Sequence, residues 1–205
     1  MRYFVKKQTP KIYLRDSQTA LMEYWKKYFH AFDVDIAHSD IMEVKADAIV
    51  SPANSFGFMT GGIDLLYKYR FGPDVEKLVQ KNIDLHYYGE LPVGQALSVP
   101  MRNQSFKYLI AAPTMRLPMI VDNTMNPYLA FRAALLEAKE LGIESVACPG
   151  LGTGSGKACL EMVARQMLMA YVSVVLQKSP TKMEDLAKQM NWMLRCSKDK
   201  KVWGV

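Results

Sequence analysis

Apolar and polar residues follow two different periods along the chain, and the two periods alternate. Short apolar runs or a period of two predict strands at 11–16, 32–38, 47–54, 94–100, 106–114 and 144–150. Apolar residues spaced by three and four predict helices at 17–30, 63–70, 75–87, 126–142, 159–176 and 181–196. Strands that alternate with helices in this way indicate an α/β domain built in three layers.

Local signals at the helix ends sharpen these boundaries. Ser17 and Asp74 are expected to cap the first and third helices, because their short side chains can accept from the exposed N–H groups of a first turn. In the clearest helix, Asn126 stands at the cap, Pro127 in the first turn and Gly142 at the end. These residues therefore predict where the three helices begin and where the clearest one ends.

The size and hydropathy of the chain indicate one core. Half of its 205 residues are apolar, which is enough for a single sizeable domain. We expect residues 1–180 to form this domain, including an N-terminal strand-helix-strand, and 181–205 to add a C-terminal helix and a basic tail packed on it. No apolar run reaches the length of a membrane span and the N-terminus lacks a signal-peptide pattern. We therefore expect a cytoplasmic protein with no membrane partner.

The three cysteines, Cys148, Cys159 and Cys196, are an odd number without a CxxC motif. Neither they nor the three histidines have the spacing of metal ligands. We expect no disulfide, no metal site and no cofactor. The formal net charge is +6, with one basic cluster at 198–201. This charge suits an anionic ligand; a nucleic-acid partner is the weaker alternative.

The stretch "ACPGLGTGSGK" at 147–157 places alternating glycines between a predicted strand and a predicted helix. It is not a P-loop, because Leu151 stands where the first glycine belongs and Ala158 where the hydroxyl belongs. The dinucleotide pattern GxGxxG fails too, at Ser155 or at Lys157 depending on the register. Backbone N–H groups ahead of a helix remain, and they suit an anion without any lysine. The alternative is a tight turn with no ligand.

A second loop follows the strand at 47–54 and supplies a partner for the first. Asp40 and Ile41 precede the strand, Asn54 ends it, and "GGID" at 61–64 follows. Together with Gly152-Thr153-Gly154, these pieces resemble the macro domain, a module that binds ADP-ribose, over residues 32–177. The resemblance implies a three-layer α-β-α sandwich with a central mixed β-sheet.

The resemblance also implies roles for individual residues. Asp40 would accept from the adenine amine, with the Ile41 N–H nearby, and Asn54 would contact the distal ribose. Asp64 would be catalytic, with Asn54 as its helper, by activating a water beside that ribose. The remaining implied ligand-binding residues are Gly61, Gly62, Ile63, Gly150, Leu151, Gly152, Thr153, Gly154, Ser155 and Gly156.

Several of these residues also have a plainer interpretation. Asp40 could be a turn residue, Asn54 could close an Asx-turn, and the two glycines at 61–62 could form a flexible loop tip. Asp64 could simply be stabilised by the helix macrodipole. The sequence leaves these alternatives open.

One position departs from the family pattern. Many macro domains carry an aromatic residue that shields the distal ribose where this chain has Gly156. Phe56 and Phe58, in the opposite loop, are candidates to supply an apolar lid instead.

Two functions compete on this evidence. The first is hydrolysis of an ADP-ribosyl linkage or of an ADP-ribose phosphoester. The second is a non-catalytic module that reads or sequesters ADP-ribose or another nucleotide. The expected partner in both cases is ADP-ribose or an ADP-ribosylated substrate, and the sequence does not define the oligomeric state.

Overall fold

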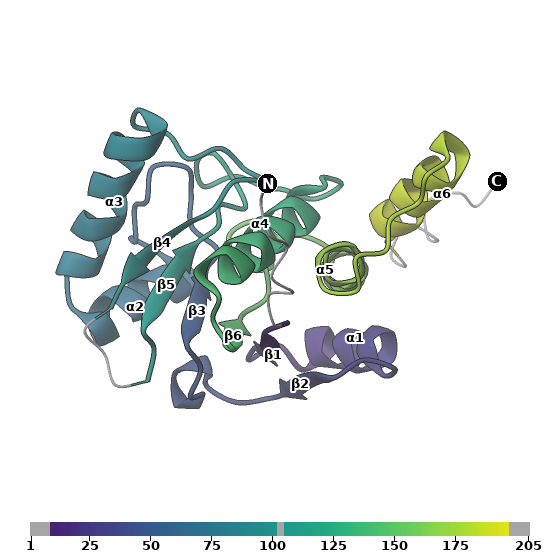
Figure 1. Ribbon diagram of the computed structural model, residues 1–205, viewed down its shortest axis with the longest axis horizontal. Helices are drawn as coiled ribbons and strands as arrows, with labels where there is room; N and C mark the ends of the chain where they lie inside the picture. The colour runs from purple at the N-terminus through teal and green to yellow at the C-terminus, as the bar shows by residue number, and fades with distance from the viewer. Residues whose placement is uncertain (1–8, 102–104, 197–205) are drawn as a thin grey trace, which may run out of the picture.

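Six strands form one sheet between two layers of helices (Figure 1). The computed structural model describes residues 9–101 and 105–196. Its strands are β1 (Lys11–Arg15), β2 (Val34–Ala37), β3 (Ala48–Ser51), β4 (Leu97–Pro100), β5 (Tyr108–Ala111) and β6 (Ser145–Cys148). Its helices are α1 (Thr19–Phe29), the 3-10 helix η1 (Ile41–Glu43), α2 (Gly62–Phe71), α3 (Asp74–Tyr87), α4 (Asn126–Leu141), α5 (Leu160–Val174) and α6 (Met183–Leu194).

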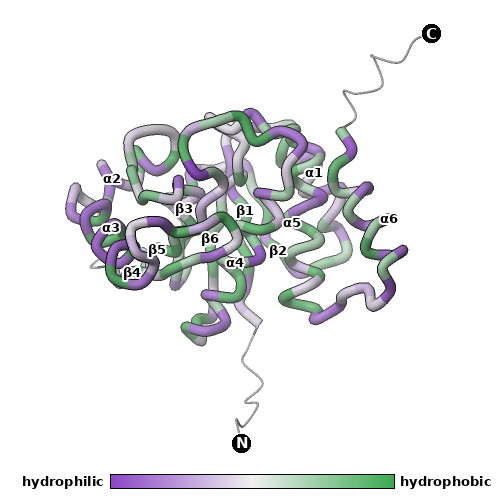
Figure 2. The backbone as a smooth tube through the Cα atoms, turned by 90° about the horizontal axis from the view of Figure 1, so that it is seen from above, coloured by the Kyte–Doolittle hydropathy of each residue, from purple (hydrophilic) through white to green (hydrophobic). Residues whose placement is uncertain are grey.

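The sheet is mixed, as predicted. The strand order is β2-β1-β6-β3-β5-β4, and every neighbouring pair is parallel except the antiparallel pair of β4 and β5. Helices α1, α4 and α5 cover one face, while α2 and α3 cover the other. Figure 2 shows the same arrangement from above, with α2 and α3 at one end of the sheet and α1, α5 and α6 toward the other. The predicted three-layer α-β-α sandwich is confirmed.

The central strand β3 shows why this sequence builds such a sheet. All four of its residues, "AIVS", are buried, as expected for a parallel strand covered by helices on both faces. Ala48 and Val50 point into the core under α4 and α5, and Ile49 points into the core under α2 and α3. Alternate residues of one apolar run therefore join the two cores.

The three predicted caps are wrong in detail. Helix α1 begins after Gln18 without a side-chain cap, and Asp16 Oδ1 accepts from the Gln18 N–H at 2.9 Å, ahead of the first turn. Asp74 is the first residue inside α3 rather than its cap. Asn126 likewise lies inside α4, and its Nδ2 donates to the Thr114 carbonyl at 2.8 Å. Asp74 pairs with Lys77 of its own helix at 3.2 Å, whereas Asn126 has its partner in the segment after β5.

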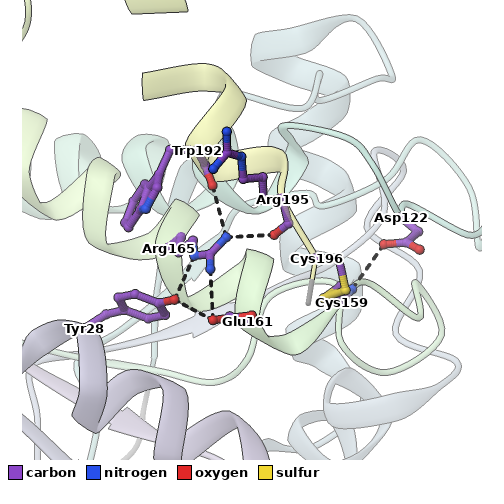
Figure 3. Close-up of a disulfide and its surroundings, with 8 residues drawn as sticks. All are labelled: Tyr28, Asp122, Cys159, Glu161, Arg165, Trp192, Arg195 and Cys196. Carbon is purple, nitrogen blue, oxygen red and sulfur yellow. Dashed lines mark hydrogen bonds and ion pairs between the residues drawn. A yellow bond between two sulfur atoms is a disulfide. The ribbon is translucent and has the colours of Figure 1, made fainter. Parts of the chain in front are cut away.

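The expectation that no disulfide forms is also wrong. Cys159 and Cys196 are joined by a disulfide, with sulfur atoms 2.13 Å apart (Figure 3). Cys148 is free and buried. The two bonded cysteines lie 37 positions apart in the sequence. They come together because α6 packs beside α5. The number of cysteines in the sequence gives no information about that packing.

Arg165 holds α6 against the body of the domain (Figure 3). Its guanidinium lies over the rings of Tyr28 and Trp192 and donates to Glu161 at 2.9 Å. It also donates to the carbonyls of Trp192 and Arg195 at the end of α6, where helix carbonyls lack intrahelical partners. One cation thus links α1, α5 and α6. The basic cluster at 198–201 lies outside the described residues.

No helix in the described part of the chain is long and apolar enough to cross a bilayer.

Candidate functional site

A cleft of about 780 Å³ opens at the carboxyl ends of the parallel strands. Loops after β1, β2, β3, β5 and β6 supply its walls. In an open α/β sheet, this edge is where ligands generally bind. The two loops predicted from the sequence to hold a ligand, after β3 and β6, both line the cleft.

The loop after β6 presents bare backbone to the cleft. Within the described residues, the N–H groups of 151–156 donate to no protein acceptor. The loop is nevertheless well fixed, because the Gly150 N–H donates to Asp16 Oδ2 at 3.0 Å and the Ala158 N–H to the Gly152 carbonyl at 3.0 Å. Gly152 has φ +73, a conformation that favours glycine. Such a fixed row of donors is an anion cradle.

The loop after β3 and the start of α2 form the facing wall. Gly61, Gly62, Ile63 and Asp64 all line the cleft. The first intrahelical donor is Leu65, whose N–H reaches the Gly61 carbonyl at 3.3 Å. The N–H groups ahead of it have no intrahelical partner, and they carry the positive end of the helix macrodipole. A second set of donors therefore lines the same cleft.

Asp64 is the unusual ionisable group of the site. Its side chain is buried, yet its only polar contact in the described residues is the Ser51 hydroxyl, which donates to Oδ1 at 2.5 Å. Burial raises the pKa of Asp64 from its ordinary value of 3.8 to about 7, while the hydrogen bond from Ser51 opposes the rise. A carboxyl group with such a pKa can accept or release a proton near neutral pH.

Comparison with known proteins agrees with this geometry. A family model described as "Macro domain" matches residues 50–167. An uncharacterized protein of Aquifex aeolicus is 37% identical over 137 residues, which cover 66% of this chain and 79% of that protein. The chain belongs to the macro domain family. The predicted family is thereby confirmed.

Solved structures show the same fold. The macrodomain of Mycobacterium tuberculosis DarG has a TM-score of 0.57 and 25% identity, covering 66% of this chain and 87% of that one. Thermosipho africanus DarTG in complex with ADP-ribose has a TM-score of 0.52 and 16% identity, covering 90% of this chain and 57% of that one.

The side-chain amide of Asn54 makes most of its hydrogen bonds within the loop after β3 of this macro domain. Its Oδ1 accepts from the N–H groups of Phe56 at 3.1 Å and Phe58 at 3.3 Å, and its Nδ2 donates to the Phe58 carbonyl at 2.8 Å. The side chain therefore builds an Asx-type turn, the plainer of its two interpretations. Asn54 also lines the cleft, so one amide N–H remains for a ligand.

Of the two candidate lid residues, Phe56 and Phe58, only one lines the cleft. Phe58 lines the cleft and is half-exposed. Phe56 is not among the cleft-lining residues, and its ring lies under the Arg116 guanidinium, 5.1 Å from it. Leu151 is also missing from the lining, because its side chain is fully buried in the core.

The aromatic shield of the family has no room at Gly156. A Cβ there would lie 2.5 Å from the Gly152 carbonyl oxygen and 2.7 Å from Val121 Cγ2. The segment after β5 occupies this space, and its residues Met115 and Pro118 line the cleft. The apolar wall expected from one residue of the glycine loop is thus built from another loop.

The other end of the cleft is polar. Asp40 lines it, and its Oδ1 accepts from the Met42 N–H at 2.9 Å, which caps η1. Ile41 lines the cleft too, although its side chain is buried. Six further lining residues lie at the ends of β1 and β2 and were not predicted from the sequence, although the strand ends predicted there could have revealed them: Arg15, Asp16, Ser17, Gln18, His38 and Ser39.

Proposed function

We propose that the chain binds ADP-ribose or an ADP-ribose derivative in this cleft. The observation that carries the proposal is the pair of backbone donor rows that line the cleft, at 152–156 and at the start of α2. Two rows of fixed N–H groups suit a diphosphate, whose charge is spread over two linked groups. The complex of Thermosipho africanus DarTG with ADP-ribose supports the same ligand class.

The charged side chains that line the cleft indicate that backbone N–H groups, rather than lysine or arginine side chains, bind the anion. Arg15 is the one lysine or arginine among the lining residues, and its guanidinium is paired with Asp35 at 2.7 Å. Asp16 and Asp40 add negative charge. The diphosphate is therefore held by oriented dipoles, and binding is expected to depend only weakly on salt.

The polar end of the cleft takes the adenosine in this proposal. Asp40 accepts from the adenine amine beside the Ile41 N–H. The distal ribose then extends toward Asn54, Gly62 and Phe58, which lie on the wall nearest Asp64. Calorimetric titration with ADP-ribose tests the proposal, and titration with AMP measures what the diphosphate and the distal ribose add.

We further propose that the chain hydrolyses the bond between the distal ribose and its substituent, with Asp64 as the general base. The carboxylate takes a proton from water as the water oxygen bonds to the anomeric carbon. The bond to the leaving group breaks, and the leaving group departs with its electron pair. The pKa of about 7 suits a general base near neutral pH. Ser51 holds Oδ1, which leaves Oδ2 to meet the water.

The competing function is binding without turnover. It is favoured by Asn54, because two of the hydrogen bonds that its amide makes fix Phe58 rather than a ribose. Asp64→Asn separates the two functions. If Asp64 is the base, the variant loses turnover of an ADP-ribosylated substrate by on the order of 100-fold and keeps its affinity for ADP-ribose.

Asp84→Asn, an exposed carboxylate on α3, serves as the control. Unchanged turnover in Asp64→Asn would remove Asp64 from the mechanism. If the wild-type chain binds ADP-ribose but turns over no substrate, its function is binding without turnover.

A further inference from the structure

A carboxylate from another loop holds the residue at which the glycine loop (150–156) begins. Asp16 Oδ2 accepts from the Gly150 N–H at 3.0 Å, although the two residues lie 134 positions apart in the sequence. Asp16 Oδ1 accepts from the Gln18 N–H at 2.9 Å. Each carboxylate oxygen therefore accepts from a backbone donor, and the side chain links the loop after β1 to the loop after β6.

The register of the sheet brings these two residues together. Strands β1 and β6 are parallel neighbours, and Leu14 lies opposite Cys148. Two residues further along each chain, where both strands have ended, Asp16 lies beside Gly150. A Cβ on Gly150 would lie 2.7 Å from Asp16 Oδ2 and 2.6 Å from Leu21 Cδ2, so a larger residue would not fit. The glycine thus lets the carboxylate approach the backbone closely.

The contact lies just ahead of the donors proposed to bind the diphosphate, the N–H groups of 152–156. At the far end of the loop, the Ala158 N–H donates to the Gly152 carbonyl at 3.0 Å. Asp16 supplies the corresponding hydrogen bond at the near end, to Gly150. A row of donors binds an anion more tightly when it is ordered beforehand, because less conformational entropy is then lost on binding.

The charge of Asp16 would by itself oppose the binding of an anion. Asp16 lines the cleft, and an ionised carboxylate repels a phosphate group nearby. Without any other effect on the site, Asp16 would weaken the binding of a diphosphate. The repulsion and the hydrogen bond to Gly150 therefore predict changes of opposite sign when Asp16 is removed.

We infer that Asp16 is a positioning residue, which raises the affinity of the cleft for a diphosphate by fixing the glycine loop. It acts through Gly150 and does not contact the diphosphate. The inference rests on the proposed function, since it concerns how the cleft binds ADP-ribose. Asp16 lies outside residues 50–167, which match the macro domain model. The N-terminal strand-helix-strand therefore contributes to the diphosphate site.

Calorimetric titration with ADP-ribose and NMR titration with adenosine test this inference. Asp16→Ala removes both hydrogen bonds, and Asp16→Asn leaves one oxygen in place of two. Asp84→Asn, at an exposed position on α3, is the control for the loss of one negative charge. Thermal unfolding verifies that each variant is folded. Should Asp16→Ala fail to fold, Asp16→Asn, which keeps the size of the side chain, provides the same comparison.

Asp16→Ala is expected to bind ADP-ribose about tenfold more weakly than the wild-type chain, because the loop must then become ordered during binding. Asp16→Asn is expected to have an intermediate affinity, and Asp84→Asn that of the wild-type chain. Affinity for adenosine, which has no phosphate, is expected to stay within about twofold in every variant. Hydrogen exchange of the Gly150 amide is expected to be faster in Asp16→Ala.

Equal or tighter binding of ADP-ribose by the Asp16 variants would overturn the inference, because only the repulsion by the carboxylate would then be seen. An equal loss of affinity for ADP-ribose and for adenosine would overturn it too, since Asp16 would then contact the adenosine. Failure of the wild-type chain to bind ADP-ribose would instead refute the proposed function, and exchange of the Gly150 amide would still show whether Asp16 fixes the loop.

Discussion

Replacing Asp64 by asparagine is expected to stabilise the fold, and to do so only above acidic pH. Asp64 is 8% exposed and receives one hydrogen bond, from Ser51. Asparagine has the same shape and can accept the same hydrogen bond through its amide oxygen. It carries no charge at any pH, so the substitution removes the desolvation penalty of the carboxylate and little else.

The magnitude follows from the pKa of Asp64. That pKa is raised by burial from 3.8 to about 7 in the folded chain. Between these two values the folded state holds a proton that the unfolded state has released, so the free energy of unfolding falls as the pH rises. Each pH unit removes about 1.4 kcal/mol, which amounts to about 4 kcal/mol by neutral pH. Below pH 3.8 both states are protonated and the penalty is absent.

Urea denaturation of the wild-type chain and of Asp64→Asn, at about pH 4 and about pH 8, measures this effect. The variant is expected to be more stable by up to about 4 kcal/mol at the higher pH and about equal at the lower pH. Asp84→Asn, on the surface of α3, is expected to show no such difference. A gain that is the same at both pH values, or a loss at the higher pH, would refute a buried carboxyl group with a raised pKa.

Three further outcomes are expected. Gly156→Ala should lower the free energy of unfolding by about 1–3 kcal/mol, because its Cβ would meet a carbonyl oxygen at 2.5 Å. Gly154→Ala, whose Cβ would meet nothing within 4 Å, should be nearly neutral. Equal denaturation midpoints for the two variants would contradict this expectation. Cys196→Ser should lower the free energy of unfolding by up to about 4 kcal/mol, because the cysteines of its disulfide lie 37 positions apart, and should remove any effect of reductant on thermal unfolding. Ser51→Ala should raise the pKa of Asp64 further, because it removes the hydrogen bond to the carboxylate. The acidic limb of the pH profile of turnover should then move to higher pH by about one unit. An unmoved limb would show that this hydrogen bond does not act on the carboxylate.

The fold could be predicted from the sequence because its signals are local. The four-residue strand "AIVS" is apolar enough to be buried on both faces, and Gly142 ends α4 in the left-handed conformation, with φ 67. The glycine loop and its partner could be found for the same reason, since each follows a strand that the apolar pattern reveals.

The rest depends on contacts between distant segments. The disulfide joins residues brought together only by the packing of α6, and Gly156 is restricted by Val121 from another loop. Asn54 was assigned both a ligand role and a turn role, and only the positions of Phe56 and Phe58 reveal how much of its amide the turn uses. Side-chain partners of this kind leave no pattern in a single sequence.

Calorimetric titration of the purified chain with ADP-ribose tests whether the two rows of backbone donors bind a diphosphate. We expect saturable binding of one ADP-ribose per chain, tighter than that of AMP and only weakly dependent on salt, because backbone N–H groups rather than lysines hold the diphosphate. Absence of binding at millimolar ADP-ribose, or binding no tighter than that of AMP, would contradict the assignment of the two donor rows to a diphosphate.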